Sequence, residues 1–439
     1  MNITRIIDNT NSIKKMIEEC KTAKFQNVAD TYLPIGPTTI EKQGLDWPSV
    51  YKAIIEISFN TKSKLNNWPE VQSKLSEHFS TNRETRDLIS IINEIYLNST
   101  GLRDITPLAY LVCEKKSNAR TNSMENIFIG LLSTPGRGDV KDEGNNLLEK
   151  LVIEALKSNC IANNNTNSKK TYLPFLSELF TKDIEELKSS TSWFVDEFEN
   201  LIELYSFLYL THLSISIGVP RLRYDLPKSQ PLYFILENET ASKDRYECNA
   251  HGYNYIFSKT TGHAKKIFPY LGYLNWITDQ PLWDLLQDDS PSLTQNINHL
   301  NSNISILFNE PYQEALDYKS AVEKGLDIQY RVIMKTDRKT ANEKVVNVFH
   351  DVFSRNFITN RRSAGSYFEL KSSTLMLLTN LVIGKGNKLL IDDVVDAFKE
   401  RGIWLDILSK NALLKFYESV GNCEKLSDSG DAVYVKSTI

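Results

Sequence analysis

Residues 368–439 read FELKSSTLMLLTNLVIGKGNKLLIDDVVDAFKERGIWLDILSKNALLKFYESVGNCEKLSDSGDAVYVKSTI. Apolar residues recur at helical spacing from about Phe368 to Ile383, and this pattern predicts a first helix. A glycine-containing break follows at 384–387, and residues 388–391 are long enough for one short strand. The stretch therefore begins with a helix, a turn and a strand.

Two more helices and a hairpin complete this pattern. Asp392 is a capping residue for a second helix, and Asp406 or Ser409 has the same role for a third. Two short strands are predicted at 424–426 and 432–436. This order of elements predicts a winged helix-turn-helix over residues 366–439, a module that usually binds nucleic acid or another protein.

The same stretch resembles the C-terminus of the DptG family, which belongs to the DNA phosphorothioation-dependent restriction systems of bacteria. The resemblance rests on short strings: FEL at 368–370 leading into LMLLTNL at 375–381, RGI at 401–403, and SDSGDA followed by Tyr434 and Val435 at 427–435. The string LYFIL at 232–236, followed by Ser242, Lys243 and Arg245, adds to it. The resemblance covers the second half of the chain.

The DptG resemblance implies a function as well as a fold. Proteins of this family act with two larger partners, DptF-like and DptH-like proteins, to attack DNA that lacks phosphorothioate modification. The resemblance thus implies a non-catalytic binding or scaffold subunit of an anti-phage restriction complex. Two alternatives stay open from the residues themselves: a metal-dependent nuclease subunit and a winged-helix transcriptional regulator.

Composition places the chain among ordinary soluble globular proteins. Of its 439 residues, 41% are hydrophobic and 24% are charged, and the net charge is −4. Five scattered cysteines without a C-x-x-C pair suit a reducing cytoplasm. The longest apolar stretch, Leu201 to Gly218, includes Glu203 and His212, so it fits a buried helix better than a membrane span. We expect a cytoplasmic protein.

The expected fold is mainly α, as a multi-domain helical protein. The polar run NNNTNSKK at 163–170 has no apolar side chain to bury, which predicts a linker or loop over 158–171. It separates an N-terminal helical region, 1–157, from a mainly helical central region, 172–355. Within the central region, 232–236 is the clearest strand.

Motifs for catalysis are weak throughout the chain. The glycine pairs are turn glycines without the G-x-x-x-x-G-K-[ST] pattern that cradles phosphate, so an ATPase is not predicted. Asp351, Glu369 and Lys371 could be assembled into a metal-dependent nuclease, with two carboxylates for Mg²⁺ and a lysine beside the attacking water. Such a Glu-x-Lys usually lies on a strand, whereas here we expect it to open the first winged-helix helix.

A metal site also has only a partial signal. Cys248, His251 and His263, with Glu247 or Asp244, offer ligands of suitable types. Structural zinc sites pair two close ligands with a second close pair, and the second pair is missing here. We therefore predict no metal and no cofactor.

Basic residues are concentrated just before the predicted winged helix. Residues 331–371 contain nine lysines or arginines and four acidic residues, which gives a net charge of +5. Arg361 and Arg362 stand in a stretch, 360–366, that we expect to be an exposed arm able to contact DNA phosphates. The alternative is a solvated linker face.

The predicted winged helix carries two kinds of surface. On its third helix, Lys410, Asn411 and Lys415 point outward and could contact a DNA groove. The buried side of that helix is predicted to consist of Ala412, Leu413, Phe416, Tyr417 and Val420. Asp428 and Asp431 make the wing acidic, so phosphate would repel it and we expect the wing to dock a protein partner.

The segment after the predicted strand at 232–236 is a further candidate for partner binding. Ser242, Lys243 and Arg245 could present a small basic site. The simpler interpretation is the start of a helix, capped by Ser242 or Thr240.

Overall fold

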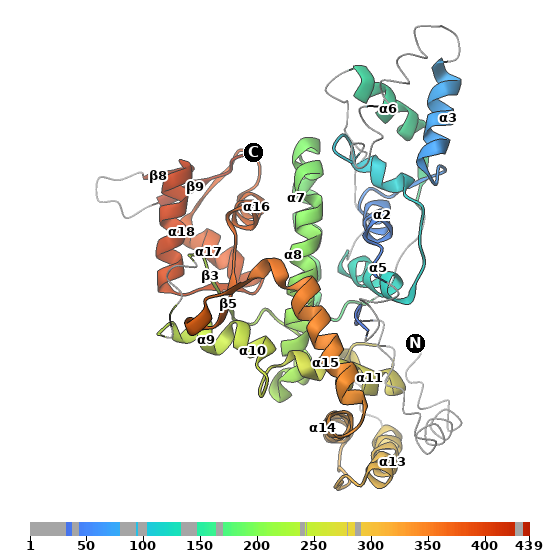
Figure 1. Ribbon diagram of the computed structural model, residues 1–439, viewed down its shortest axis with the longest axis vertical. Coiled ribbons are helices and arrows are strands. Elements are labelled where there is room, and N and C mark those ends of the chain that lie inside the picture. Colours follow the sequence, from blue (N-terminus) through green and yellow to red (C-terminus); the bar gives the residue numbers. More distant parts are fainter. Residues whose placement is uncertain are drawn as a thin grey trace.

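The computed structural model describes residues 32–36, 44–79, 94, 103–132, 147–163, 170–237, 242, 244–278, 280–285, 291–425 and 433–439. Of these residues, 65% are helical and 9% lie in strands. The chain is therefore mainly α, as the sequence predicts. Figure 1 shows the N-terminal helices on one side of a long central helix and the C-terminal elements on the other side.

The N-terminal part is built from helices joined by one small sheet. Its elements are α2 (Trp47–Ser58), β1 (Thr61–Ser63), α3 (Trp68–Phe79), η1 (Pro107–Val112), α5 (Ala119–Leu131), α6 (Leu147–Ser158) and β2 (Cys160–Ala162). Strands β1 and β2 pair antiparallel. The predicted linker begins at residue 158, and this boundary is wrong, because residues 160–162 form strand β2. The strand is held by backbone hydrogen bonds to β1, which the side chains of the sequence do not reveal. Residues 164–169 of the predicted linker lie outside the described residues.

Two consecutive helices, α7 (Pro174–Leu187) and α8 (Thr191–Gly218), form the centre of the molecule. Helix α8 is buried on all sides from Leu204 to Gly218, and by length and composition it is apolar enough to cross a membrane. However, 94% of its most apolar 18-residue window is buried inside the protein. A helix that is hydrophobic all round is expected where neighbours cover every side, as the sequence predicts for this stretch.

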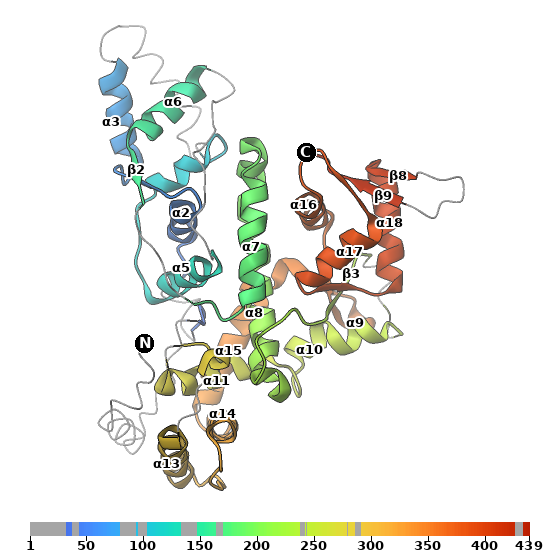
Figure 2. The same cartoon turned by 180° about the vertical axis from the view of Figure 1, so that it is seen from behind.

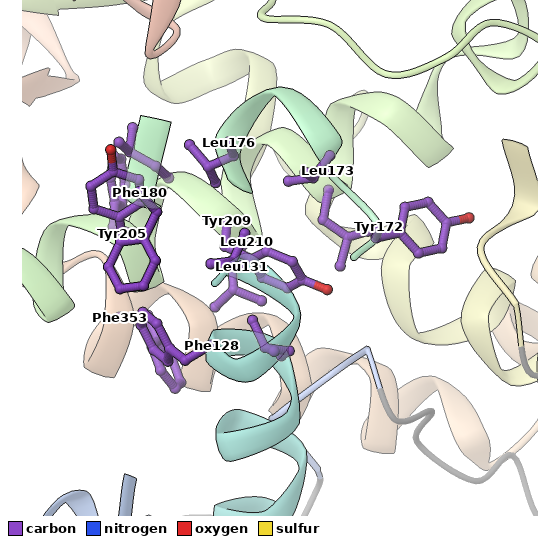
Figure 3. Packing of buried hydrophobic residues seen from close by; sticks show 14 of the residues in the cluster. Phe128, Leu131, Tyr172, Leu173, Leu176, Phe180, Tyr205, Tyr209, Leu210 and Phe353 are labelled. Carbon is purple, nitrogen blue, oxygen red and sulfur yellow. The ribbon is translucent and has the colours of Figure 1, made fainter. Parts of the chain in front are cut away.

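Aromatic side chains fill the space between α5, α7 and α8. The ring of Phe180 lies 5.4 Å from that of Phe128 and 4.7 Å from that of Tyr205, measured between centroids. Figure 3 shows these rings with Leu131, Leu176 and neighbouring residues in one continuous cluster. This packing connects the N-terminal helices to the central pair, so both belong to one hydrophobic core.

The central region continues with short elements and four longer helices. They are η2 (Pro220–Arg223), β3 (Leu232–Ile235), α9 (Tyr246–His251), α10 (Tyr253–Phe257), α11 (Ala264–Ile277), α12 (Leu282–Leu285), α13 (Pro291–Phe308), α14 (Tyr318–Lys335) and α15 (Arg338–Val348). A π-helical turn, η4 (Phe349–Phe353), and a 3-10 turn, η5 (Arg355–Phe357), follow α15. Strand β3 confirms the strand that the sequence predicts in this region.

A four-stranded sheet joins the central region to the C-terminal part. Its order is β4 (Ile358–Asn360), β5 (Ser366–Glu369), β3 and β7 (Ile403–Leu405). Strand β3 runs parallel to both β5 and β7, and β4 pairs antiparallel with β5. The prediction of a helix from about Phe368 is therefore wrong, because Tyr367 and Phe368 are both buried, on opposite faces of this sheet. Strand β7 was not predicted.

The elements after β5 follow the predicted order closely. They are α16 (Ser372–Ile383), β6 (Lys388–Leu390), α17 (Ile391–Glu400), α18 (Ile407–Val420), β8 (Cys423–Lys425) and β9 (Val433–Lys436). The strands form an antiparallel sheet in the order β6-β9-β8. We call residues 372–439 the C-terminal module. The predicted wing turn, with Asp428 and Asp431, lies outside the described residues.

Candidate functional site

The start of α18 is fixed by an ion pair with a distant segment. Asp406 caps the helix by accepting a hydrogen bond from the Ser409 amide at 2.9 Å. The same carboxylate accepts from Arg245 Nε at 2.7 Å and from a second guanidinium nitrogen of Arg245. Arg245 also donates to the Ser409 hydroxyl at 2.6 Å. The guanidinium therefore joins the residue before α9 to the first turn of α18.

Burial and pairing act in opposite directions on this ion pair. Only 2% of the Arg245 side chain and 7% of the Asp406 side chain are exposed. Burial alone would raise the pKa of the Asp406 carboxyl, but hydrogen bonds from Arg245 and the Ser409 amide hold it below its ordinary value. Burial, together with the Asp406 charge, raises the pKa of the adjacent Cys248 thiol to about 12. The thiol is thus a neutral donor, 3.3 Å from the Asp406 carboxylate.

This geometry corrects one of the predicted partner-binding residues. Arg245 is buried and fully engaged inside the protein, so its side chain is structural rather than a docking contact. Ser242 is half-buried, and Lys243 and Thr240 lie outside the described residues. Helix α9 begins at Tyr246 without a side-chain cap, so the predicted capping role of Ser242 is also wrong.

Arg361 and Arg362 stand in a tight β-hairpin, not in a free arm. Strands β4 and β5 enclose residues 361–365, and the Arg361 amide donates to the Gly365 carbonyl at 2.8 Å. Arg362 is exposed and Arg361 is half-buried. The prediction of an exposed arm is wrong, because β4 and β5 pair on either side of residues 361–365 and close them into a loop. Both strands are too short for their periodicity to be visible in the sequence. We call residues 358–369 the basic hairpin.

A tyrosine connects the basic hairpin to the segment in front of α9. The Tyr367 hydroxyl lies 2.9 Å from the Ser242 carbonyl and 3.0 Å from the Ala364 carbonyl. The Arg245 amide donates to the same Ser242 carbonyl at 3.3 Å. Residues 242–245 therefore contact the hairpin on one side and α18 on the other. The structure brings together three segments that the sequence analysis treated separately.

The outer side of α18 combines polar and apolar side chains. Lys410, Asn411 and Lys415 are all exposed, as predicted, and neither lysine pairs with an acidic residue in the described part of the chain. Ile407 and Leu408, in the first turn, are 77% and 52% exposed. Tyr246, at the start of α9, is 75% exposed. We call these six residues the α9–α18 surface.

One residue of the predicted inner side of α18 lies outside instead. Ala412, Leu413 and Tyr417 are buried, whereas Val420 is 48% exposed. Val420 is the last residue of the helix, before Gly421 ends it in the left-handed conformation at φ 74°. The apolar face of α18 is therefore buried along most of the helix, but its last residue, Val420, lies outside the core.

Figures 1 and 2 show where α9 lies relative to α18. In both views α9 lies next to the N-terminal end of α18, the end opposite to β8. Tyr246 directly follows Arg245, and Ile407 directly follows Asp406. The exposed apolar residues thus flank the buried ion pair, which holds both helix starts in place.

Several basic residues elsewhere in the C-terminal half pair with acidic residues. Arg331 and Lys335 both bind Glu310, at 2.9 and 2.6 Å, and burial leaves that carboxylate 1% exposed. In the sheet of the C-terminal module, Glu424 binds Lys388 and Lys436, at 3.3 and 3.0 Å. Glu310 lies outside residues 331–371 but neutralises part of their positive charge. The effective net charge of that stretch is therefore smaller than the +5 counted from its own residues.

The candidate nuclease residues are not brought together. Glu369 ends strand β5, so the expectation that it opens a helix is wrong. Its side chain shares a sheet face with Thr359, while the pKa of its carboxyl is raised by burial. Asp351 instead hydrogen-bonds His350, whose other ring nitrogen lies 3.1 Å from the Tyr253 hydroxyl. Tyr253 packs on Phe368, whose side chain lies on the opposite face of β5 from Glu369.

The candidate metal ligands are likewise separated. Cys248 is buried against Asp406, and His251 is exposed. His263 packs edge-to-face with Tyr255, with ring centroids 4.5 Å apart, and burial lowers the pKa of His263 to about 4. Within the described ranges, no group of three or more His, Cys, Asp or Glu side chains could hold a metal ion.

A second buried ion pair attaches the C-terminal module to the central helices. Arg401, which ends α17, donates to Asp183 of α7 from Nε at 3.0 Å and from a second nitrogen. The Tyr205 hydroxyl of α8 donates to the same carboxylate at 2.5 Å. Burial alone would lower the pKa of the Arg401 guanidinium, but Asp183 raises it above its ordinary value. The side chains are 2% and 0% exposed.

Gly402 and His212 complete this junction. Gly402 has φ +80°, and a Cβ atom there would stand 1.9 Å from His212 Nε2. The His212 ring is buried without a hydrogen-bond partner for either nitrogen, and burial lowers its pKa to about 4. Only a residue without a side chain fits between α17 and α8 at this point.

Sequence reasoning missed Asp406, Tyr246, Ile407 and Leu408 as parts of the site. The pairing of Asp406 with Arg245 spans 161 positions and has no local signal. Ile407 and Leu408 did carry one, because they fall outside the apolar stripe that buries α18. Comparison of the sequence with protein-family models and with curated proteins finds no match.

Proposed function

We propose that the C-terminal module is a winged helix-turn-helix. The support is the order of its elements, with helix α16, strand β6, helices α17 and α18, and strands β8 and β9. The sheet order β6-β9-β8 places the first strand beside the last, so the hairpin packs along the helices. In this interpretation α18 is the recognition helix, and β8 and β9 are the strands of the wing.

The chain acts, in this proposal, as a non-catalytic binding subunit of a DNA-restriction complex. The resemblance of residues 368–435 to the DptG family gives the setting: a system that attacks DNA lacking phosphorothioate modification, with DptF-like and DptH-like partners. The scattered positions of Asp351, Glu369 and the candidate metal ligands support a binding role over a nuclease. The acidic wing, with Asp428 and Asp431, would contact a partner protein.

One observation carries the DNA-binding part of this proposal. The basic hairpin contacts Ser242 through Tyr367, and the start of α18 contacts Arg245, so the hairpin that carries Arg361 and Arg362 lies close to the first turn of α18. Lys410, Asn411 and Lys415 add a polar helix face without acidic partners in the described residues. Duplex phosphates would contact the hairpin, and α18 would approach a groove.

Fluorescence anisotropy with a labelled DNA duplex tests this assignment. The double variant Arg361→Ala/Arg362→Ala should weaken binding most at low salt and lower the salt slope by about one to two phosphate contacts. The matched control is Lys64→Ala/Lys319→Ala, which removes two exposed charges far from the hairpin in sequence. Equal loss in both variants would show that the hairpin has no special part.

A nuclease assay tests the non-catalytic part of the proposal. The purified protein should leave plasmid DNA intact in Mg²⁺ or Mn²⁺, because its carboxylates do not converge on a metal. Cleavage that Glu369→Ala abolishes would replace the binding role with a nuclease.

A further inference from the structure

The first turn of α18 exposes more apolar surface than a DNA-reading helix requires. Ile407 and Leu408 are 77% and 52% exposed, and Tyr246, which follows the Arg245 that binds Asp406, is 75% exposed. Base edges and phosphates are contacted by polar side chains at the start of a recognition helix. Exposed aromatic and aliphatic side chains that gather at one place are typical of protein-binding sites.

This apolar site is held on a rigid base. Arg245 and Asp406 form a buried ion pair and directly precede Tyr246 and Ile407 in the sequence, and the Ser409 hydroxyl donates to the Phe234 carbonyl of β3 at 3.1 Å. The starts of α9 and α18 are therefore tied to each other and to the sheet. A site that is already ordered loses little conformational entropy when a partner binds, so its affinity is higher.

The charges around the site are uneven, and they restrict what can cover it. On α18, Lys410 and Lys415 have no acidic partner in the described residues, while Glu418 is engaged by Lys425 at 2.8 Å. At the start of α9, Asp244, which precedes the helix, and Glu247, in its first turn, are both exposed. The α18 side is basic and the α9 side is acidic, so a complementary partner has an apolar stripe with acidic residues along its α18-facing flank.

We propose that the α9–α18 surface docks an amphipathic helical segment of a partner protein, with acidic residues on the flank that faces Lys410 and Lys415. Its apolar stripe covers Tyr246, Ile407 and Leu408, as a helix lies in a hydrophobic groove. The inference deepens the proposed function, on which it rests for the C-terminal module as a binding module. Because the partner and DNA share the two lysines, the docked segment excludes DNA from α18.

A peptide-display selection on the full-length protein tests the docking surface. A library of random 20-residue peptides should yield binders with apolar residues at helical spacing and an excess of Asp and Glu. The variant Ile407→Ser/Leu408→Ser should weaken the selected peptides about tenfold or more. The matched control, Ile306→Ser/Leu316→Ser, removes two apolar side chains on and after α13 that are at least as exposed, and it should leave binding unchanged.

A charge-reversal variant tests the acidic flank separately. Lys410→Glu/Lys415→Glu should weaken the selected acidic peptides about tenfold and should select basic peptides instead. The side chains changed in the two variants, Ile407 and Leu408 in one and Lys410 and Lys415 in the other, are all exposed in the folded protein. Circular dichroism should therefore show that both variants keep the native helix content. No enrichment, or selected peptides that bind the Ser variant as well as the native protein, would overturn the docking surface.

Duplex anisotropy on the same preparations separates this inference from the proposed function. Selected peptides that bind while DNA does not would remove the DNA role and leave the docking surface in place. If Ile407→Ser/Leu408→Ser abolishes DNA binding and no peptide is selected, the first turn of α18 reads DNA and the docking surface is wrong. If the peptides bind and compete with DNA, both proposals are supported.

Discussion

Two Arg–Asp ion pairs attach the C-terminal module to the rest of the protein, and they differ in how exposed the neighbouring side chains are. Arg401–Asp183 joins α17 to α7, and Tyr205 and His212 of α8 close it from solvent. Arg245–Asp406 joins the start of α18 to the start of α9, and the residues next to it in sequence are exposed. We call these the inner and the outer junction.

The difference indicates separate roles for the two junctions. An ion pair enclosed by α7, α8 and α17 can fix the position of the module but cannot take part in recognition. An ion pair whose two residues directly precede Tyr246 and Ile407 orders side chains that a partner can contact. Loss of the inner junction should therefore unfold or detach the module, whereas loss of the outer junction should mainly change what it binds.

Arg401→Ala should give the largest effect, because it leaves the Asp183 carboxylate buried without its counter-charge. Breaking one side of a buried ion pair typically costs about 3 to 5 kcal/mol of unfolding free energy. Urea unfolding followed by tryptophan fluorescence measures this loss. The control Lys425→Ala breaks an exposed ion pair, with Glu418, and should change stability by less than about 1 kcal/mol.

Equal losses in Arg401→Ala and Lys425→Ala would contradict the distinction between inner and exposed charges. A smaller loss in Arg401→Ala than in Lys425→Ala would mean that water reaches the inner junction.

Acidification should act on the inner junction next. Burial lowers the pKa of His212 from 6.5 to about 4. Between these two pH values the imidazole is protonated in the unfolded chain but neutral in the folded protein. Stability is therefore lost as pH falls through this window, by about 2 kcal/mol between pH 7 and pH 5 from this residue alone. Urea unfolding at the two pH values measures the difference.

Replacement of His212 isolates its part in the pH dependence. His212→Leu removes the titrating ring and breaks no hydrogen bond, since neither ring nitrogen has a partner. This variant should lose less stability between pH 7 and pH 5 than the native protein. The exposed control, His251→Asn, should keep the native pH dependence. An unchanged pH dependence in His212→Leu would show that the inner junction admits protons or water.

Local signals in the sequence predicted most elements of the C-terminal module, but the predicted cap at Asp392 is wrong, because α17 already begins at Ile391, after Leu390 and without a side-chain cap. Asp406 caps α18 as predicted, and Gly384 and Gly386, with φ 79° and 68°, form the predicted break after α16. These features depend on neighbours a few positions away, so single residues reveal them. The mainly helical fold class followed for the same reason.

The junctions and the four-stranded sheet could not be predicted in the same way. Strands β5 and β7 have four and three residues, too few for a period of two to stand out. Arg401 and Asp183 are 218 positions apart, and nothing near either residue indicates its partner. The site therefore depends on tertiary pairing, whereas its individual exposed residues, such as Lys410 and Lys415, follow from helical periodicity.

Asp406→Asn should give the smallest loss and is the sharpest test of the outer junction. An asparagine keeps the cap on the Ser409 amide but removes the charge that Arg245 pairs with. The cost should be only about 1 to 2 kcal/mol, because Arg245 lies next to exposed residues and its flexible side chain can move toward water. That movement would loosen the starts of α9 and α18 together. Peptides selected on the native protein should therefore bind Asp406→Asn more weakly, even at temperatures far below its unfolding midpoint, while DNA contact by the basic hairpin stays unchanged. A loss as large as that of Arg401→Ala, with peptide binding intact, would make the outer junction a second structural anchor and end the distinction between the two.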